Sequence, residues 1–272
     1  MKVELGPVQE TLLIPLLGRA RETQKPKGLV RDPKAVEIVE KLDYDFAKWE
    51  GARSLQGSVF RTRMYDQEVE AFLKAHPDGT VVELGCGLNT RFERLDNGRA
   101  RWFDLDLPDT MQLRQTFFED VPRRTMITAS VTDTEWHAEV QATGGPWIFL
   151  SEAVLIYLEA PLVEQTIRQL VANFPGATLV IDTTSQQMVE GQSSHDVMRT
   201  MRKDSWFRWV CNNPQELSGW GLQLEASRTF LEAGDELLAH LPRMMRLVVR
   251  WAPWILRRRL DGYRINRFTL NA

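Results

Sequence analysis

The sequence predicts an α/β fold with a mostly parallel seven-stranded sheet and helices on both faces. First, a run of β-branched and apolar residues at 80–84 indicates a short buried strand. Second, Gly85-Cys86-Gly87 follows this strand directly and precedes a short helix expected at about 89–95. Third, strands and helices alternate from there to about residue 182. A strand, a glycine turn and a helix in this order form the first βα unit of a nucleotide-binding sheet.

The residues around the glycine turn indicate which nucleotide it binds. Gly85 and Gly87 let the backbone turn sharply and let a ligand approach where a Cβ would collide. Asp106 lies 19 positions after Gly87, close to the offset of about 20 residues at which a carboxylate binds ribose hydroxyls. Thr90 replaces the third glycine of a dinucleotide fingerprint, and Glu83 suits a cationic ligand better than a pyrophosphate. Together they favour S-adenosylmethionine, with a turn that binds no ligand as the alternative.

Composition and net charge limit the classes of protein to which this chain can belong. The chain of 272 residues is 43% hydrophobic and 26% charged, as is typical of soluble globular proteins. A net charge of −3 gives no reason to expect nucleic acid as a partner. Cys86 and Cys211 do not form a disulfide framework, and residues 1–17 show no secretory leader, so we expect a cytoplasmic protein. No apolar run approaches the length of about 20 residues needed for membrane insertion.

The N-terminal region, residues 1–56, is expected to be a helical lid on the sheet. Apolar residues at 9–24 have helical spacing, and Asp32-Pro33 begins a second helix with proline at its first position. Arg61 and Arg63 come next, ahead of the helix that leads to the glycine strand. They either lie on a solvated face or hold the carboxylate of the methionyl group, for which a guanidinium is suited.

The cofactor-binding core is expected at residues 57–183. Ser130 and Val131 end the third strand and are candidates for contacts with adenine, while Thr132 or Asp133 is expected to cap the next helix. Glu152 follows the fourth strand, where open α/β sheets bind ligands, and a buried carboxylate there favours a functional role. The expected strands are 101–108, 125–129, 146–150 and 177–182, with helices at 109–119, through 136–140 and at 160–174.

Residues 184–213 are predicted to form a helical cap over the acceptor pocket. This long polar insertion contains Ser185 and His195. His195 is either a general base or an exposed loop histidine. The histidines show no spacing typical of metal ligands, so we expect no metal.

The last segment, 214–272, is expected to complete the sheet. It contains a short helix at 214–220 and strands at 223–230 and 263–270. Between the strands, residues 243–259 form a basic amphipathic stretch. We interpret it as core-packed helices with a solvated basic face, the alternative being contact with a membrane surface or an acidic carrier protein.

Several motifs resemble the leucine carboxyl methyltransferase family. The stretch 84–91 (Leu-Gly-Cys-Gly-Leu-Asn-Thr-Arg) is similar to the family's glycine loop, Leu-Gly-Ala-Gly-Leu-Asp-Thr-Arg. Thr11, Arg19-Ala20 and Asp32-Pro33-x-Ala35 resemble the bacterial branch that includes a tetracenomycin polyketide O-methyltransferase. Further similar blocks are Arg61-Thr62-Arg63 with Asp66, Asp106-Leu107-Pro108, Thr132-Asp133-x-x-Trp136 and Glu152-Ala153-Val154-Leu155-x-Tyr157-Leu158.

The resemblance implies a Rossmann-like class I methyltransferase that binds S-adenosylmethionine. Arg61 would hold the cofactor carboxylate, Gly85 would pass the methionyl part, Asp106 would bind the ribose, and Glu152 would lie near the amino group. Asn89 departs from the family's usual Asp, and Ser130 stands where an Asp commonly meets adenine. The complete predicted cofactor site is Arg61, Glu83, Gly85, Gly87, Asp106, Leu107, Ser130, Val131 and Glu152. Arg19, Ser185 and His195 are candidates for acceptor binding, and His195 and Tyr157 for catalysis.

The activity that follows is O-methylation of a carboxylate or phenol on a small molecule, such as a polyketide-like secondary metabolite. No His–Asp dyad stands out in the sequence, which favours a carboxylate or an acidic phenol, since neither needs a strong base. The alternatives are methylation of a protein or peptide C-terminus, and a catalytically silent binding protein that keeps the fold.

Overall fold

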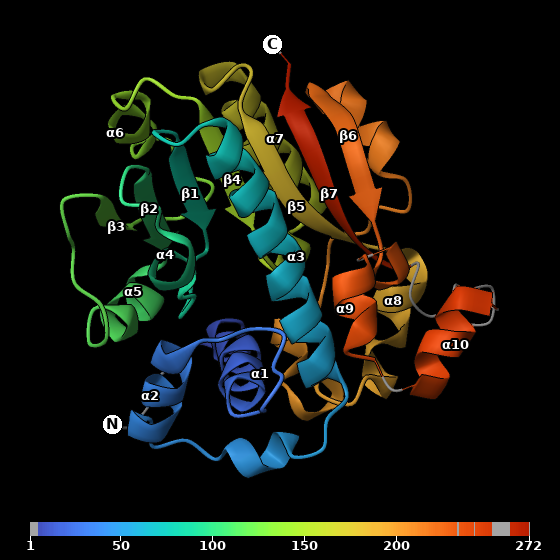
Figure 1. Cartoon of the computed structure of the whole chain (residues 1–272). Coiled ribbons are helices and arrows are strands. Elements are labelled where there is room, and N and C mark those ends of the chain that lie inside the picture. The colour runs from blue at the N-terminus through green and yellow to red at the C-terminus, as the bar shows by residue number, and fades with distance from the viewer. Residues whose placement is uncertain (1–4, 233, 242, 252–261, 272) are drawn as a thin grey trace.

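A seven-stranded sheet forms the centre of the computed structural model, which describes residues 5–232, 234–241, 243–251 and 262–271 (Figure 1). Its strand order is β3-β2-β1-β4-β5-β7-β6. β3, β2, β1, β4 and β5 are parallel to one another, whereas β7 is antiparallel to both β5 and β6. The predicted fold class is confirmed. The strands are β1 (Thr80–Leu84), β2 (Arg101–Asp106), β3 (Arg124–Thr128), β4 (Trp147–Ser151), β5 (Thr178–Thr184), β6 (Leu222–Arg228) and β7 (Tyr263–Leu270).

Helices cover both faces of this sheet. Figure 1 shows α3 crossing in front of the strands and α7 behind them. All five residues of β1 are buried, as expected of a central parallel strand that is covered on both sides. The helices of this part are α3 (Ser54–Ala75), α4 (Arg91–Leu95), α5 (Pro108–Arg114), α6 (His137–Gln141) and α7 (Ala160–Asn173).

The N-terminal helices lie across the carboxyl ends of the parallel strands (Figure 1). A 3-10 turn, η1 (Gln9–Leu12), leads into α1 (Leu13–Thr23), whose proline is at the third position, where a backbone N–H has no partner within the helix. The carboxylate of Asp32 caps α2 (Pro33–Lys41) by accepting the N–H of Ala35 at 2.9 Å. A second 3-10 turn, η2 (Phe46–Trp49), precedes α3.

After β5 the chain forms short helical turns before it returns to the sheet. These are α8 (Gln186–Glu190), η4 (Gly191–Ser194), η5 (Met198–Thr200), η6 (Lys203–Ser205) and η7 (Pro214–Trp220). After β6 come η8 (Phe230–Glu232), α9 (Asp235–Ala239) and α10 (Arg243–Trp251). No helix within the described ranges is long and apolar enough to span a bilayer.

Three local predictions differ from the structure. The helix expected at 109–119 ends at Arg114, because the chain turns there and buries Phe118, whose ring lies 4.2 Å from the Arg114 guanidinium carbon. Neither Thr132 nor Asp133 caps α6; the Asp133 carboxylate instead accepts the N–H of Ser130 at 2.8 Å. On α10, Val249 is buried but Leu247 and Trp251 are 54% and 70% exposed, so only part of its apolar surface packs on the core. Residues 252–259 of the predicted basic stretch lie outside the described residues.

Candidate active site

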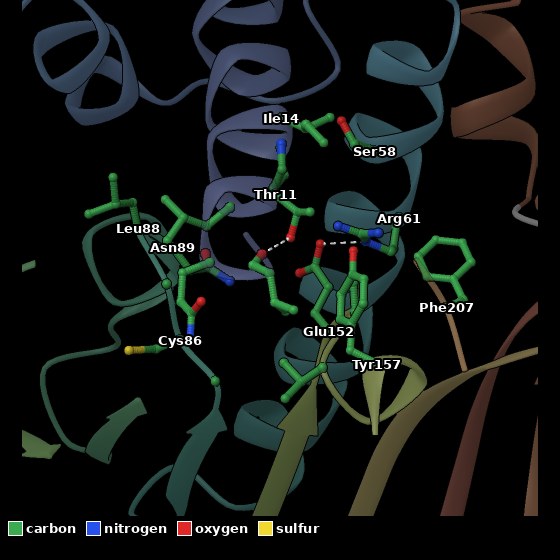
Figure 2. A pocket seen from close by; sticks show the side chains of 18 of the residues that line it. Thr11, Ile14, Ser58, Arg61, Cys86, Leu88, Asn89, Glu152, Tyr157 and Phe207 are labelled. Atoms are coloured by element: carbon green, nitrogen blue, oxygen red, sulfur yellow. Dashed lines mark hydrogen bonds and ion pairs between the residues drawn. The ribbon is translucent and has the colours of Figure 1, made fainter. Parts of the chain in front are cut away.

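A cavity of about 670 Å³ lies at the carboxyl ends of β1, β2 and β4 (Figure 2). The glycine turn after β1 and the segments that follow β2, β3 and β4 line one part of it, and η1, α1, the first half of α3 and the turns after α8 line much of the rest. All nine predicted cofactor-binding residues line the cavity, as do Arg19, Tyr157 and His195. Ser185 is absent from its lining because the Ser185 hydroxyl faces the first turn of α8 and accepts the N–H of Met188 at 3.3 Å.

The glycine turn presents bare backbone to this cavity. Gly85 and Gly87 have positive φ angles of 74° and 52°, a conformation that side chains disfavour. A Cβ on Gly85 would lie 2.9 Å from Cγ1 of Val154, and one on Gly87 would lie 3.3 Å from Cβ of Leu12. Both positions therefore require glycine, as the sequence predicts.

Two buried arginines hold the carbonyls of this turn. Nη1 of Arg114 donates to the carbonyls of Gly87 and Asn89 at 3.0 and 2.7 Å. Nη2 of Arg19 donates to the carbonyl of Leu88 at 2.8 Å, while Nε of Arg19 pairs with Asp32 at 2.8 Å. These contacts give Arg19 a role in shaping the turn; because Arg19 also lines the cavity, its contact with the acceptor stays a prediction.

Asp106 is oriented by the same turn. Its Oδ2 accepts the N–H of Gly87 at 2.7 Å, and its Oδ1 accepts the N–H of Leu107 at 2.8 Å. Burial raises the pKa of Asp106, while these two N–H groups act in the opposite direction. Each carboxylate oxygen keeps a lone pair for a ligand hydroxyl. The side chain can thus accept further hydrogen bonds from a ligand in the cavity.

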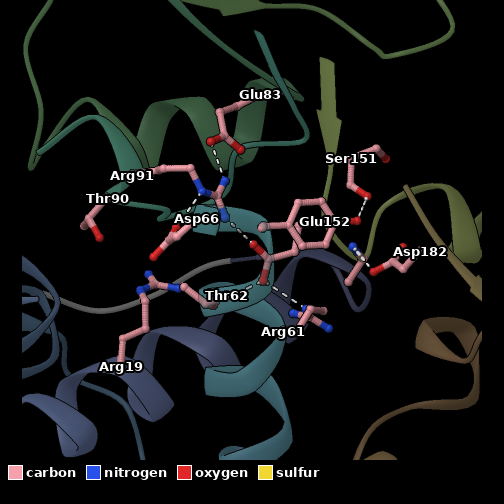
Figure 3. Close-up of polar contacts among 12 residues, drawn as sticks. Arg19, Arg61, Thr62, Asp66, Glu83, Thr90, Arg91, Ser151, Glu152 and Asp182 are labelled. Carbon is pink, nitrogen blue, oxygen red and sulfur yellow. Dashed lines mark hydrogen bonds and ion pairs between the residues drawn. The ribbon is translucent and has the colours of Figure 1, made fainter. Parts of the chain in front are cut away.

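Two arginines flank Glu152 at the end of β4 (Figure 3). Its Oε1 accepts from Nε of Arg61 at 2.9 Å and from the hydroxyl of Thr62 at 3.2 Å, and its Oε2 accepts from Nη2 of Arg91 at 2.7 Å. Burial opposes ionisation of Glu152, but Arg61 and Arg91 outweigh it and lower the pKa to about 2. Glu152 is therefore an anion that fixes the Arg61 guanidinium against the cavity wall.

Glu83 has a partner inside the protein, and its contact with a cationic ligand stays a prediction. Arg91, which is fully buried, pairs with Glu83 and also with Asp66 at 2.9 Å. Burial raises the pKa of Glu83, and Arg91 opposes this change. The negative charge of Glu83 is thus balanced inside the protein. Sequence reasoning missed Arg91 as this partner, although it ends the family-like glycine stretch.

Arg61 and Arg63 have different surroundings, and the contact of Arg61 with the cofactor carboxylate stays a prediction. Arg61 turns to the cavity, whereas Arg63 pairs with Glu70 at 2.7 Å and Glu236 at 3.1 Å. Arg63 is not among the cavity-lining residues.

Asp182 and Tyr263 extend the charged group behind Arg61 and were not predicted. Nη1 of Arg61 donates to the Tyr263 hydroxyl at 3.3 Å, and that hydroxyl donates to Asp182. Asp182 also accepts the N–H of Ala153 at 2.7 Å, which holds Ala153 at a positive φ of 55°. Burial raises the pKa of Asp182 to about 6, although Arg61 opposes this shift.

Two orphaned polar atoms show that this part of the cavity suits a polar ligand. Oδ1 of Asn89 and the hydroxyl of Thr110 are buried without a hydrogen-bond partner among the described residues, and both residues line the cavity. Leaving such atoms unpaired costs about 1–3 kcal/mol each. Together with Asp106 and the bare glycine turn, they fit a nucleoside rather than a purely apolar molecule.

Beyond Arg61 the cavity becomes largely apolar. Its wall there includes Leu158, Met188, Met198, Phe207 and Phe230. His195 is only partly exposed and lines this same part, so it is not the freely exposed loop histidine considered above. The described residues contain no cluster of three or more His, Cys, Asp or Glu side chains that could hold a metal ion.

The parallel sheet with an antiparallel β7, the glycine turn and the carboxylate at the end of β2 define a class I methyltransferase, whose cofactor is S-adenosylmethionine. The leucine carboxyl methyltransferase model matches residues 13–171, and the chain belongs to this family.

Proteins similar to this chain in sequence or in fold are also methyltransferases. The tetracenomycin polyketide synthesis O-methyltransferase TcmP of Streptomyces glaucescens is 28% identical over 235 residues, which cover 85% of this chain and 86% of that protein. The S-adenosyl-L-methionine-dependent methyltransferase dpfgK of Gibberella zeae is 30% identical over 190 residues, covering 64% and 63%. A putative S-adenosylmethionine-dependent methyltransferase from Listeria monocytogenes has the same fold, with a TM-score of 0.50, 15% identity, and coverage of 77% of this chain and 99% of that one.

Proposed function

We propose that this methyltransferase transfers the methyl group to an oxygen atom, a phenol or a carboxylate, of a small and largely apolar molecule. The observation that carries the proposal is the division of the cavity. Its polar half contains Asp106 and Arg61, and its apolar half, closed by the turns after α8, leaves room for an acceptor. The similarity to an O-methyltransferase of polyketide synthesis supports oxygen as the methylated atom.

The contacts at the polar half support one orientation of the cofactor. Asp106 would bind the ribose, and Ser130, Val131 and Leu107 would flank the adenine. Arg61 would hold the cofactor carboxylate because Glu152 fixes the guanidinium at 2.9 Å. The amino group would lie near Glu152. When bound, the cofactor supplies an activated methyl group, so the protein's task is to align the acceptor oxygen.

The test is a mass-spectrometric screen of apolar phenols and acids for a mass gain of one methyl group in place of hydrogen. A methyl ether or ester that requires both the protein and S-adenosylmethionine is expected, and Asp106→Ala should reduce its formation. Products found only with peptide C-termini would replace the small-molecule proposal. A protein that does not bind the cofactor in calorimetry would instead be a silent binding module.

A further inference from the structure

The hydroxyl of Tyr263, the first residue of β7, links Arg61 to Asp182. Nη1 of Arg61 donates to this hydroxyl at 3.3 Å, and the hydroxyl donates its own hydrogen to the Asp182 carboxylate. A hydroxyl has only one hydrogen, so toward Arg61 it acts purely as an acceptor. Tyr263 therefore contacts Arg61 at a nitrogen other than the one that Glu152 holds.

The surroundings of Tyr263 fix the position of this hydroxyl. Asp182 is fully buried, and the backbone N–H of Ala153 donates to its carboxylate at 2.7 Å. The Tyr263 ring stacks on that of Phe230, with 5.8 Å between the ring centroids and 13° between the planes. In addition, β7, which begins at Tyr263, pairs with β5, which carries Asp182. Tyr263 thus presents its hydroxyl to Arg61 from a well-packed position in the sheet.

Arg61 is held at two of its three guanidinium nitrogens. Nε donates to Glu152 at 2.9 Å, and Nη1 donates to Tyr263 at 3.3 Å. Within the described part of the chain Nη2 has no hydrogen-bond partner, and the Arg61 side chain lines the cavity. Two contacts fix the plane of a guanidinium, whereas a single contact leaves it free to turn about that bond. The two anchors therefore direct the remaining N–H groups of Arg61 to the cavity.

We propose that Tyr263 is a positioning residue that orients Arg61 toward the carboxylate of the cofactor. The inference rests on the proposed function, in which Arg61 holds this carboxylate. Without the Tyr263 hydroxyl, Nη1 loses its acceptor, and the guanidinium can turn toward the negative charge of Asp182. Arg61 then holds the cofactor carboxylate less well, while the contacts of the nucleoside, which lie elsewhere in the cavity, are kept.

The test compares two ligands that differ only in this carboxylate. The first is S-adenosylhomocysteine, and the second is S-adenosyl-3-thiopropylamine, the same molecule without the carboxylate. Calorimetry is done at pH 8, where Asp182 is ionised because its pKa is about 6. The wild type should bind the first ligand about tenfold more tightly or better. Tyr263→Phe should weaken binding of the first ligand about three- to tenfold, as for the loss of one hydrogen bond, and should change the second less than about twofold.

Tyr65→Phe is the matched control. Tyr65 is also fully buried, and its hydroxyl donates to the carbonyl of Ser151 at 2.8 Å, but it does not line the cavity. This variant also loses one buried tyrosine hydroxyl, so it measures the general cost of such a change. The ratio of its two Kd values should equal that of the wild type. Tyr263→Met, a second variant that lacks the hydroxyl, should change the ratio as Tyr263→Phe does.

A double variant shows whether Tyr263 acts through Arg61. Arg61→Ala should remove most of the preference for S-adenosylhomocysteine over the thiopropylamine. Adding Tyr263→Phe to Arg61→Ala should then reduce the affinity for S-adenosylhomocysteine no further, because the group that Tyr263 positions is already absent. A merely structural role of Tyr263 would instead give losses that add.

The outcomes separate this inference from the proposed function. The inference is overturned if Tyr263→Phe weakens both ligands equally or neither of them, or if the losses in the double variant add. The proposed function survives these results as long as Arg61→Ala selectively lowers the affinity for S-adenosylhomocysteine. A wild type that binds the two ligands equally well, or an Arg61→Ala variant that loses both equally, would contradict the proposed orientation of the cofactor itself.

Discussion

Replacing Asp106 by alanine tests the proposed ribose contact. The Asp106 carboxylate is held by the N–H groups of Gly87 and Leu107 at 2.7 and 2.8 Å, so its remaining lone pairs have fixed directions. Hydrogen bonds to a charged group contribute about 1.5–3 kcal/mol, and part of this is offset because the bound hydroxyls can find water in the variant. We expect a net loss of about 1–3 kcal/mol in binding free energy, or about a 5- to 150-fold higher Kd.

Isothermal titration calorimetry with S-adenosylhomocysteine measures this change, with Asp109→Ala as the matched control. Asp109 is three positions further along the chain and also accepts a backbone N–H, that of Thr110 at 2.8 Å, but it does not line the cavity. The control should bind as the wild type does. An unchanged Kd in Asp106→Ala, or an equal loss in both variants, would refute the ribose assignment.

Three further predictions follow from individual contacts. Arg61→Ala should weaken binding of S-adenosylhomocysteine in calorimetry by at least tenfold, while Arg63→Ala, whose partners are Glu70 and Glu236, should change it less than twofold; the reverse order would contradict the assignment. Gly176 has a φ of 81° and open space where a Cβ would lie, so Gly176→Ala should lose about 1–2 kcal/mol of unfolding free energy. Gly85→Ala should lose clearly more, because its Cβ also meets Val154. Equal losses in the two variants would show that the glycine turn after β1 can accommodate a Cβ at position 85. Burial raises the folded-state pKa of Asp182 from 3.8 to about 6, so the native state holds more protons than the unfolded state in that window and loses stability as pH rises through it. Denaturant unfolding should therefore show the unfolding free energy of the wild type falling by about 2 kcal/mol relative to Asp182→Asn between pH 4 and 6, whereas parallel curves would argue against a buried, titrating Asp182.

Local sequence patterns were sufficient to predict the frame of the site. Gly85, Gly87 and Asp106 act through their own backbone or through a neighbour at a fixed offset, and such features can be recognised in a single chain. The positions of the strands along the chain follow similarly, because each apolar run is bounded by its own turn signals. The shortened α5 was missed because the burial of Phe118 depends on tertiary packing.

The buried charges could not be predicted because their partners are distant in sequence. Arg114 bonds to carbonyls 27 and 25 positions earlier, and Asp182 meets Tyr263 only because β5 and β7 are neighbours in the sheet. A single sequence gives no indication of such pairs. Glu83 is a different case: its partner Arg91 is only 8 positions away, but the pairing depends on how the glycine turn folds back.

A crystal structure with S-adenosylhomocysteine tests the central claim most directly. The account predicts that the ribose hydroxyls lie within hydrogen-bond distance of Asp106 and that the cofactor carboxylate meets Arg61, with the sulfur facing the apolar half of the cavity. A ligand bound elsewhere, or a ribose that leaves Asp106 without a contact, would contradict it.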